Sequence, residues 1–249
     1  MILKSTSVTS PHHEILYEDP FLLIVGKPAG LLTIPDRLGN KDNLQSALER
    51  QFGKVFVVHR LDRETSGILC FARTEAAHRH LSMQFEHHTA DKYYHVLVDG
   101  IVHQDEGEIN KPIGEHASIP GKMTIRAQGK PSLTFYRVLH RFKHFTLLEA
   151  LLKTGRTHQI RVHFQSIGFP LAVDALYGRR PALFLSEIKG KAYKSGKFSG
   201  DERPLMERTS LHATRLRIDH PETGERMEFK AELPKDFQAV LNQLEKWGG

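Results

Sequence analysis

A strongly charged loop lies between two apolar segments in the stretch VFVVHRLDRETSGILCFA, residues 55–72. Residues 55–58 and 68–72 are apolar and rich in β-branched side chains, which favours two short buried strands. The residues between them, 59–67, include two arginines and two carboxylates. Catalytic and binding side chains tend to lie on polar loops that leave a rigid scaffold. By its charges alone the loop is more typical of a solvated turn, so its interpretation depends on the rest of the chain.

On both sides of this loop the apolar residues predict one continuous domain with many strands and few helices. Towards the N-terminus, residues 15–17 and 21–25 predict a strand hairpin, and a helix follows with Asp42 or Asn43 as its N-cap and Gly53 as its end. Further strands are expected at 94–100, 145–152, 211–218 and 226–230, and further helices at 74–85, 157–167 and 233–247, with Thr74 and Thr157 as N-caps. The expected fold class is α+β, with a mixed, mainly antiparallel sheet that is flanked by helices and carries a central basic cleft.

The composition is that of a folded, basic protein. Of the 249 residues 39% are hydrophobic, and 35 Lys and Arg against 29 Asp and Glu give a formal net charge of +6. With a pI near 9.4, a nucleic-acid partner is one hypothesis, and a charge that serves solubility alone is the other. The single cysteine, Cys70, lies in an apolar run and excludes an intramolecular disulfide and a cysteine-rich zinc site.

Neither a membrane nor a metal ion is indicated as a partner. No apolar run approaches the roughly 18 residues of a membrane span, and residues 1–13 lack the apolar stretch of a secretory signal, so a cytoplasmic location is expected. Four histidines invite a metal interpretation, but they have no carboxylate at ligand spacing and favour a solvated helix face instead; they are His78, His80, His87 and His88.

A second group of charged residues occurs in the stretch KTGRTHQIRVH, residues 153–163, at the expected start of a helix. A helix N-terminus with added arginines is a natural site for a phosphate or a carboxylate. Thr157 and Arg161 are four residues apart, so they would share a helical face, and Arg161 could reach a carboxylate on a neighbouring loop. The alternative is an ordinary helix start with cations that face solvent.

The segment 179–208 departs from the pattern of the rest of the chain. It is rich in Lys, Arg, Gly and Ser, with scattered aromatic residues, and it resembles an inserted basic loop. Basic residues interleaved with aromatics suit contact with RNA through phosphates and stacking. A solvated insertion without function is the alternative.

Three motifs resemble, in the same order, the core motifs of the RluA-type pseudouridine synthases: HRLD with TSG (59–67), KYYHVLVDG (92–100) and GRTHQIR (155–161). Further signatures of that family are KPAG at 27–30 and GFPL at 168–171, the latter followed by Asp174 and by Tyr177 with Gly178. The resemblance implies one catalytic domain, residues 14–249, after an N-terminal extension, residues 1–13. Because KPAG begins at Lys27, no small RNA-binding domain is expected before it.

The resemblance also implies an activity and roles for single residues. The activity is isomerisation of uridine to pseudouridine in structured RNA, either transfer RNA or large-subunit ribosomal RNA, by a monomer without cofactor or metal. Asp62 matches the catalytic aspartate of the family, Tyr94 the tyrosine that lies against the target uracil and assists proton removal, and Arg161 the arginine that pairs with the aspartate.

Three further arginines are candidates for contact with the RNA. Arg60 resembles the residue that fills the gap left by a flipped nucleotide, and Arg63 and Arg156 can meet phosphates. A uracil inside folded RNA cannot reach Asp62 unless it is extruded, at a cost of a few kcal/mol that phosphate contacts and stacking can offset.

The residue types suit this chemistry but leave alternatives open. Asp62 could add to the anomeric carbon of the ribose or remove a ribose proton, and a neighbouring arginine would favour its ionised form. A non-catalytic RNA-binding or chaperone protein of the same fold would need only the basic cleft. A nucleoside hydrolase would need a second carboxylate, and the nearest one, Glu64, is expected on the surface.

Overall fold

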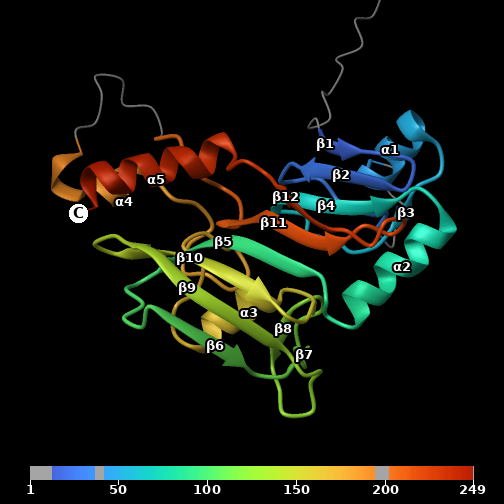
Figure 1. Cartoon of the computed structure of the whole chain (residues 1–249). Coiled ribbons are helices and arrows are strands. Elements are labelled where there is room, and N and C mark those ends of the chain that lie inside the picture. Colours follow the sequence, from blue (N-terminus) through green and yellow to red (C-terminus); the bar gives the residue numbers. More distant parts are fainter. Residues whose placement is uncertain (1–12, 37–41, 194–201, 249) are drawn as a thin grey trace, which may run out of the picture.

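A ten-stranded mixed sheet organises the part of the chain that the computed structural model describes, residues 13–36, 42–193 and 202–248. Its strands follow the order β1-β2-β4-β11-β5-β10-β9-β6, with β3 beside β4 and β12 beside β11 (Figure 1). Their bounds are β1 Glu14–Glu18, β2 Leu22–Lys27, β3 Phe56–Val57, β4 Ser66–Ala72, β5 Asp91–Asp99, β6 Glu106–Asn110, β9 Leu133–Arg141, β10 Phe145–Leu152, β11 Leu211–Asp219 and β12 Arg226–Lys230. A separate hairpin consists of β7 Ile113–Glu115 and β8 Met123–Ile125, and the helices are α1 Leu44–Phe52, α2 Glu75–Glu86, α3 Gln159–Ser166, α4 Leu185–Lys189, the 3₁₀ turn η1 Gly190–Ala192 and α5 Lys235–Trp247.

Strand β11 joins the two halves of the sheet. It pairs in parallel with β4, where His212 lies opposite Ser66, and antiparallel with β5. All other pairs of strands in the described residues are antiparallel. At the parallel junction Gly67 has a φ of 120°, and a Cβ there would lie 2.2 Å from the carbonyl oxygen of Ala213, so the two strands can approach only because this residue is glycine. The predicted mixed, mainly antiparallel sheet is confirmed.

Several predicted helix ends are confirmed. Asn43 Oδ1 accepts a hydrogen bond of 3.0 Å from the backbone N–H of Ser46 at the start of α1, and Gly53 ends that helix. Thr74 Oγ1 accepts a bond of 3.1 Å from the backbone N–H of Ala77 at the start of α2. These caps satisfy N–H groups that have no partner within the helix, which is why the residue type predicts them.

Helix α3 starts later than predicted. Its N-cap is His158, whose backbone is left-handed, with φ 57° and ψ 20°, and whose side chain makes no capping bond. The side chain of Gln159 folds back instead, and its Oε1 accepts a bond of 3.0 Å from the backbone N–H of Arg156. The prediction of Thr157 as N-cap is therefore wrong, because the helix begins only at Gln159, whose side chain closes the turn before it. Thr157 lies outside the helix and shares no helical face with Arg161.

Two hydrophobic clusters make up most of the core. The larger lies between the sheet and helices α1, α2 and α3, and it includes Cys70, which is buried as expected. The second is formed where α4 and α5 lie together at one end of the sheet (Figure 1). No helix in the described residues is long and apolar enough to cross a membrane.

The expectation of a simple inserted loop at 179–208 is corrected for the described residues. Leu183, Ile188 and Met206 are buried in the second cluster together with residues of α5. Arg208 makes two hydrogen bonds, of 2.6 and 2.9 Å, to the carboxylate of Asp236 on α5. The parts at 179–193 and 202–208 therefore pack against the domain because they contribute their own apolar and charged anchors. Residues 194–201, and residues 1–12 of the expected N-terminal extension, lie outside the described residues.

Candidate active site

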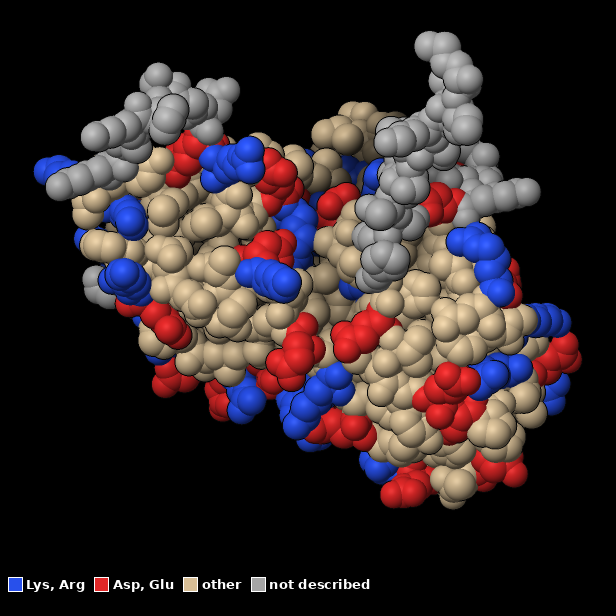
Figure 2. All heavy atoms as spheres, turned by 90° about the horizontal axis from the view of Figure 1, so that it is seen from above, with Lys and Arg blue, Asp and Glu red and all other residues tan. Residues whose placement is uncertain are grey.

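A cleft of about 980 Å³ opens between the loop after β3, strand β5 and the start of α3. Its lining includes five cations and three carboxylates, namely Arg60, Arg63, Lys92, Arg156, Arg161, Asp36, Asp62 and Glu86. On the face shown in Figure 2, by contrast, Lys and Arg are interspersed with Asp and Glu without a patch of one sign. The excess of positive charge in the lining confirms the predicted basic cleft and suits a polyanionic ligand.

The loop that carries Asp62 is held in place through its backbone. Thr33 Oγ1 accepts a hydrogen bond of 3.2 Å from the N–H of Leu61 and donates one of 2.9 Å to the carbonyl of the same residue. The N–H of Thr65 donates to the carbonyl of Asp62 at 3.1 Å. The side chain of Asp62 stays 30% exposed in the cleft, so its carboxylate oxygens are accessible to a ligand.

Lys27 also holds this loop in place. Its Nζ donates hydrogen bonds to the carbonyls of Pro28, Leu31 and Arg63, at 2.9, 2.8 and 3.0 Å, although the residue is only 2% exposed. Burial lowers the pKa of Lys27 to about 7. The KPAG motif thus ties the end of β2 to the loop 59–65, a role that the residue types alone did not reveal.

Arg161 is held mainly by a carboxylate that sequence reasoning did not assign to it. Its Nε and Nη2 donate to both oxygens of Asp174, at 2.6 and 2.9 Å, while its Nη1 lies 3.5 Å from Asp62 Oδ2. Asp174 also accepts bonds from the backbone N–H groups of Leu176 and Tyr177. Burial alone would raise the pKa of Asp174, but the bonds and charge of Arg161 and the two amides lower it overall. The predicted contact between Arg161 and Asp62 is present, but it is longer than the bonds from Arg161 to Asp174.

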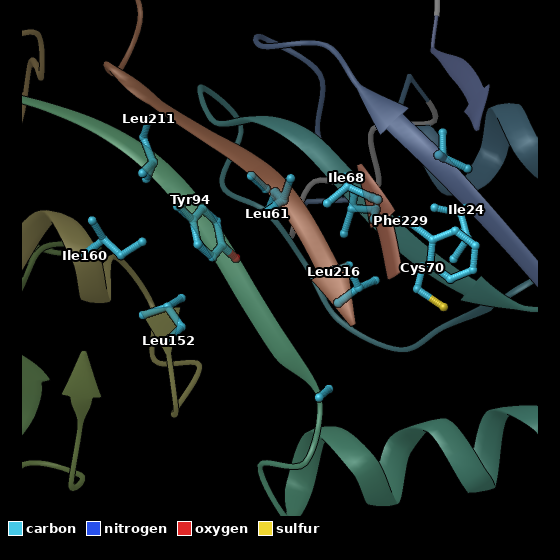
Figure 3. Close-up of a cluster of buried hydrophobic side chains, with 14 of the residues drawn as sticks. Ile24, Leu61, Ile68, Cys70, Tyr94, Leu152, Ile160, Leu211, Leu216 and Phe229 are labelled. Atoms are coloured by element: carbon cyan, nitrogen blue, oxygen red, sulfur yellow. The ribbon is translucent and has the colours of Figure 1, made fainter. Parts of the chain in front are cut away.

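Tyr94 rises from β5 into the cleft. Its side chain is buried, with Leu61 on one side and with Leu152 and Ile160 on the other (Figure 3). Burial, and after it the negative charge of Asp62, raises the pKa of Tyr94 well above its usual value. The phenol therefore keeps its proton in the resting site. The structure brings together all three predicted catalytic residues at one cleft.

His158 is a further neighbour of Asp62. Its Nε2 lies 3.9 Å from Asp62 Oδ2, and its Nδ1 lies 2.9 Å from the hydroxyl of Tyr177. That hydroxyl accepts a bond of 2.7 Å from the N–H of Met123, so its own proton is available to Nδ1, which places the imidazole proton on Nε2, facing Asp62. Burial lowers the pKa of His158, which favours the neutral ring. Only the occurrence of His158 and Tyr177 within family motifs signalled this pair.

The predicted RNA-binding arginines all line the cleft, but the structure holds them differently. Arg60 is exposed, and Arg63 is exposed with its Nε bonded to the carbonyl of Gly30 at 3.0 Å. Arg156 is half-buried, and its Nε donates to the carbonyl of Pro131 at 3.2 Å. Glu64 is exposed, as predicted, and approaches Arg63 rather than Asp62.

The four histidines of the metal hypothesis do not form a common site. His78 and His80 are half-buried on α2, where His78 stacks on Phe56 and bonds to a backbone carbonyl, so the predicted solvated face is wrong for these two. His87 and His88 are exposed at the end of the helix. Among the described residues no three His, Cys, Asp or Glu side chains are grouped so as to hold a metal ion.

Comparison with known proteins shows the family of the chain. A model of the family described as RNA pseudouridylate synthase matches residues 21–166. The chain belongs to this family. The chain is 37% identical over 244 residues to the Bacillus subtilis protein named Uncharacterized RNA pseudouridine synthase YlyB, covering 94% of this chain and 74% of that one. It is 38% identical over 237 residues to Ribosomal large subunit pseudouridine synthase D of Pseudomonas aeruginosa, covering 93% and 71%.

Solved structures place the fold in the same family. The structure of human RNA Pseudouridylate Synthase Domain Containing 1 superposes with a TM-score of 0.66 at 28% identity, over 90% of this chain and 84% of that one. The resemblance seen in the three motifs is thus confirmed, and with it the catalytic-domain fold. The chain is an RNA pseudouridine synthase, an isomerase of uridine in RNA.

Proposed function

We propose that this synthase isomerises a uridine of large-subunit ribosomal RNA, with Asp62 as the catalytic carboxylate. One observation carries the assignment of Asp62. Its oxygens are exposed in the cleft, beside Arg161 Nη1 at 3.5 Å and His158 Nε2 at 3.9 Å, while the other carboxylate of this cluster, Asp174, is buried and fully occupied. The choice of ribosomal RNA rests on the printed name of the Pseudomonas relative.

The reaction requires one bond to the ribose to be exchanged for another. The bond from C1′ to N1 of the uracil breaks, the base turns, and a bond from C1′ to C5 forms, after which C5 loses its proton to a base or to water. Asp62 promotes the first step, either as a nucleophile at C1′ or as a base towards the ribose, and Arg161 Nη1, at 3.5 Å from Asp62 Oδ2, helps to hold the carboxylate in position. The cleft must exclude water from C1′, since water would turn the isomerisation into hydrolysis.

The other predicted residues bind and orient the RNA. Tyr94 lies against the uracil as a phenol, because burial and the charge of Asp62 hold its proton. Arg60 fills the space left by the extruded nucleotide, and Arg63 and Arg156 contact phosphates at the edge of the cleft. The proposal includes a monomer that works in the cytoplasm, where ribosomal RNA is made in bacteria; size-exclusion chromatography with light scattering tests the monomer.

The first test measures tritium released from RNA transcripts labelled at C5 of uridine. The substrates are large-subunit ribosomal RNA and transfer RNA, and the proteins are wild type, Asp62→Asn and the matched control Glu64→Gln, which removes an exposed carboxylate from the same loop. We expect wild type and Glu64→Gln to release tritium from ribosomal RNA, and Asp62→Asn to be at least about 1000-fold slower while it still binds RNA.

Other outcomes separate the alternatives. Release by Asp62→Asn at the wild-type rate would remove Asp62 from the chemistry. Release from transfer RNA alone would replace the ribosomal substrate. RNA binding by wild type without release from either transcript would favour a non-catalytic RNA-binding or chaperone protein, and free uracil in the supernatant would indicate a hydrolase.

A further inference from the structure

Lys92 is a buried cation in the wall of the cleft that none of the roles above uses. It lies on β5 two residues before Tyr94, and both residues are buried, at 8% and 6% exposure. Side chains of a strand alternate between its two faces, so Lys92 and Tyr94 point to the same face. Both line the cleft, whereas Tyr93 between them lies against Arg215 on the opposite face.

The ammonium group of Lys92 has no polar partner. Within the described residues no hydrogen bond or ion pair reaches its Nζ, which lies 5.6 Å from the centre of the Phe85 ring. The carboxylate of Asp91 attracts it electrostatically but is already occupied, by Lys153 at 3.1 Å and by Arg226 at 3.0 Å. Lys27, the other buried lysine of the cleft region, donates three hydrogen bonds. Lys92 Nζ is not among the fully buried side-chain atoms without a partner, so it reaches the cleft, where an anion can meet it. A charge on a residue with so little access to solvent is normally paired.

The surroundings of Lys92 are also cationic. A Cβ on Gly155 would lie 3.4 Å from Lys92 Nζ, so the bare backbone of the turn before α3 faces the ammonium. Arg156 follows in the same turn and lines the same cleft. Burial first, and then the charges of Arg156 and Lys153, lowers the pKa of Lys92 to about 8. Two neighbouring cations repel each other, and their proximity becomes favourable when an anion lies between them.

We propose that Lys92 and Arg156 bind a backbone phosphate of the RNA, the one attached to the uridine that faces Tyr94 and Asp62. This inference rests on the proposed function, because it assumes that a uridine of RNA occupies the cleft. Residues two apart on a strand are separated by about 7 Å, which matches the distance between the base and the phosphate of one nucleotide. A lysine ammonium acts as a compact point charge and is a common phosphate ligand.

This contact would fix the nucleotide during the reaction. The base must detach and turn while C1′ stays beside Asp62, so the ribose needs an anchor that does not involve the base. A phosphate held by Lys92 and Arg156 supplies that anchor, because it is joined to the ribose and takes no part in the exchange of bonds. Lys92 is thus a binding residue for the backbone, distinct from the residues that contact the base.

The test uses a uridine pentanucleotide as a defined probe that needs no extrusion from a duplex. It is made once with phosphodiester linkages and once with uncharged methylphosphonate linkages, and the affinities are measured at fixed salt by fluorescence anisotropy. The first variant is Lys92→Met, which replaces the ammonium group near the Phe85 ring by an apolar group of similar length. The control is Lys246→Met, which removes a lysine that also lies over an aromatic ring, Trp247, but does not line the cleft.

We expect Lys92→Met to bind the phosphodiester probe at least about tenfold more weakly than wild type, and the methylphosphonate probe as wild type does. Lys246→Met should match wild type on both. An equal loss on both probes, or no loss on either, would overturn the proposal. Tritium release by wild type tests the proposed function separately. If wild type releases tritium but Lys92→Met loses affinity equally for both probes, only the phosphate site is rejected. If Lys92→Met loses affinity for the phosphodiester probe alone but wild type releases no tritium, only the proposed function is rejected.

Discussion

The two walls of the cleft hold Asp62 and Arg161 in opposite ways. On the wall formed by the end of β2 and the loop 59–65, Lys27 and Thr33 bind backbone groups, and the Asp62 carboxylate is left 30% exposed. On the wall formed by β5 and α3, Arg161 is only 8% exposed, and its side chain donates two hydrogen bonds to Asp174. One wall fixes the main chain and leaves the side chain free, and the other fixes the side chain itself.

This difference follows from what each group has to do. A carboxylate that exchanges covalent or hydrogen-bonding partners during the reaction needs free oxygens, so its position must come from the backbone. A cation that has to remain charged and aimed needs a permanent partner, and a buried arginine also needs one to be stable. Substitutions on the two walls should therefore separate activity from stability.

The largest effect is expected for Arg161→Met. It leaves Asp174 as a buried carboxylate without its cation, so the free energy of unfolding should fall by about 4 kcal/mol, and tritium release should be lost as well. Chemical denaturation and the tritium assay measure the two effects. The double variant Arg161→Met with Asp174→Asn should recover much of the stability, because asparagine still accepts from the amides of Leu176 and Tyr177, but it should stay inactive. A double variant as unstable as the single one would show that the pair with Asp174 is not the cause.

Asp62→Asn should separate activity from stability most clearly. Because no other bond of the loop depends on its carboxylate, its stability should lie within about 0.5 kcal/mol of wild type although it is inactive. A loss of stability as large as that of Arg161→Met would contradict the difference between the walls.

For Lys27→Met, on the first wall, we expect a loss of stability that is smaller than that of Arg161→Met but larger than that of Asp62→Asn. The substitution leaves the carbonyls of Pro28 and Leu31 without the Lys27 donor, which should cost about 3 kcal/mol, whereas the carbonyl of Arg63 keeps its bond from the N–H of Gly30 at 2.9 Å. Lys92→Met, by contrast, removes a buried cation that has no polar partner in the described residues, and it should be neutral or stabilising at pH 7. Denaturant titrations of both variants compare them directly. Equal destabilisation would mean that Lys92 has a structural role like that of Lys27.

Local pattern was enough to predict most strands and the caps at Asn43 and Thr74, and the resemblance to the family implied that Asp62, Tyr94 and Arg161 meet in one cleft. These features depend on neighbouring residues or on motifs whose types carry the chemistry. The partner of Arg161 could not be predicted in the same way. Asp174 lies thirteen residues further on, after the end of α3, and only the folded turn at Leu176 brings its carboxylate back to the helix.

The unpredicted features share a cause. Helix α3 has His158 rather than Thr157 as its N-cap, and the amide of Gln159 folds back on the preceding turn, which residue preferences for caps do not describe. The three carbonyls on Lys27 come from segments that meet only in the folded chain. Sequence motifs indicated which residues matter, but the atoms that each one contacts depend on how distant segments cross.

The charge of Lys92 gives a prediction on pH. Its pKa is lowered from 10.5 to about 8 in the folded chain, so between these values the unfolded chain binds a proton that the folded chain has released. Raising the pH through this window therefore favours the folded state, by about 1 kcal/mol for each pH unit. Unfolding free energies of wild type and Lys92→Met at pH 8 and pH 10 isolate this contribution. The same pH dependence in both proteins would show that Lys92 has an ordinary pKa.

The smallest effect is expected for Tyr177→Phe, which tests the support that the second wall gives to Asp62. The variant removes the hydroxyl that joins Met123 to His158, so His158 loses the bond that directs its Nε2–H towards Asp62. We expect a loss of about 1 kcal/mol in stability and a roughly fivefold lower kcat with unchanged KM, because the ring of Tyr177 still packs against Arg161. Steady-state tritium release over a range of RNA concentrations measures kcat and KM, and the ring nitrogen shifts of His158 report its tautomer. A rise in KM at constant kcat would assign Tyr177 to RNA binding instead, and the position of Asp62 would then depend on its own loop and on Arg161 alone.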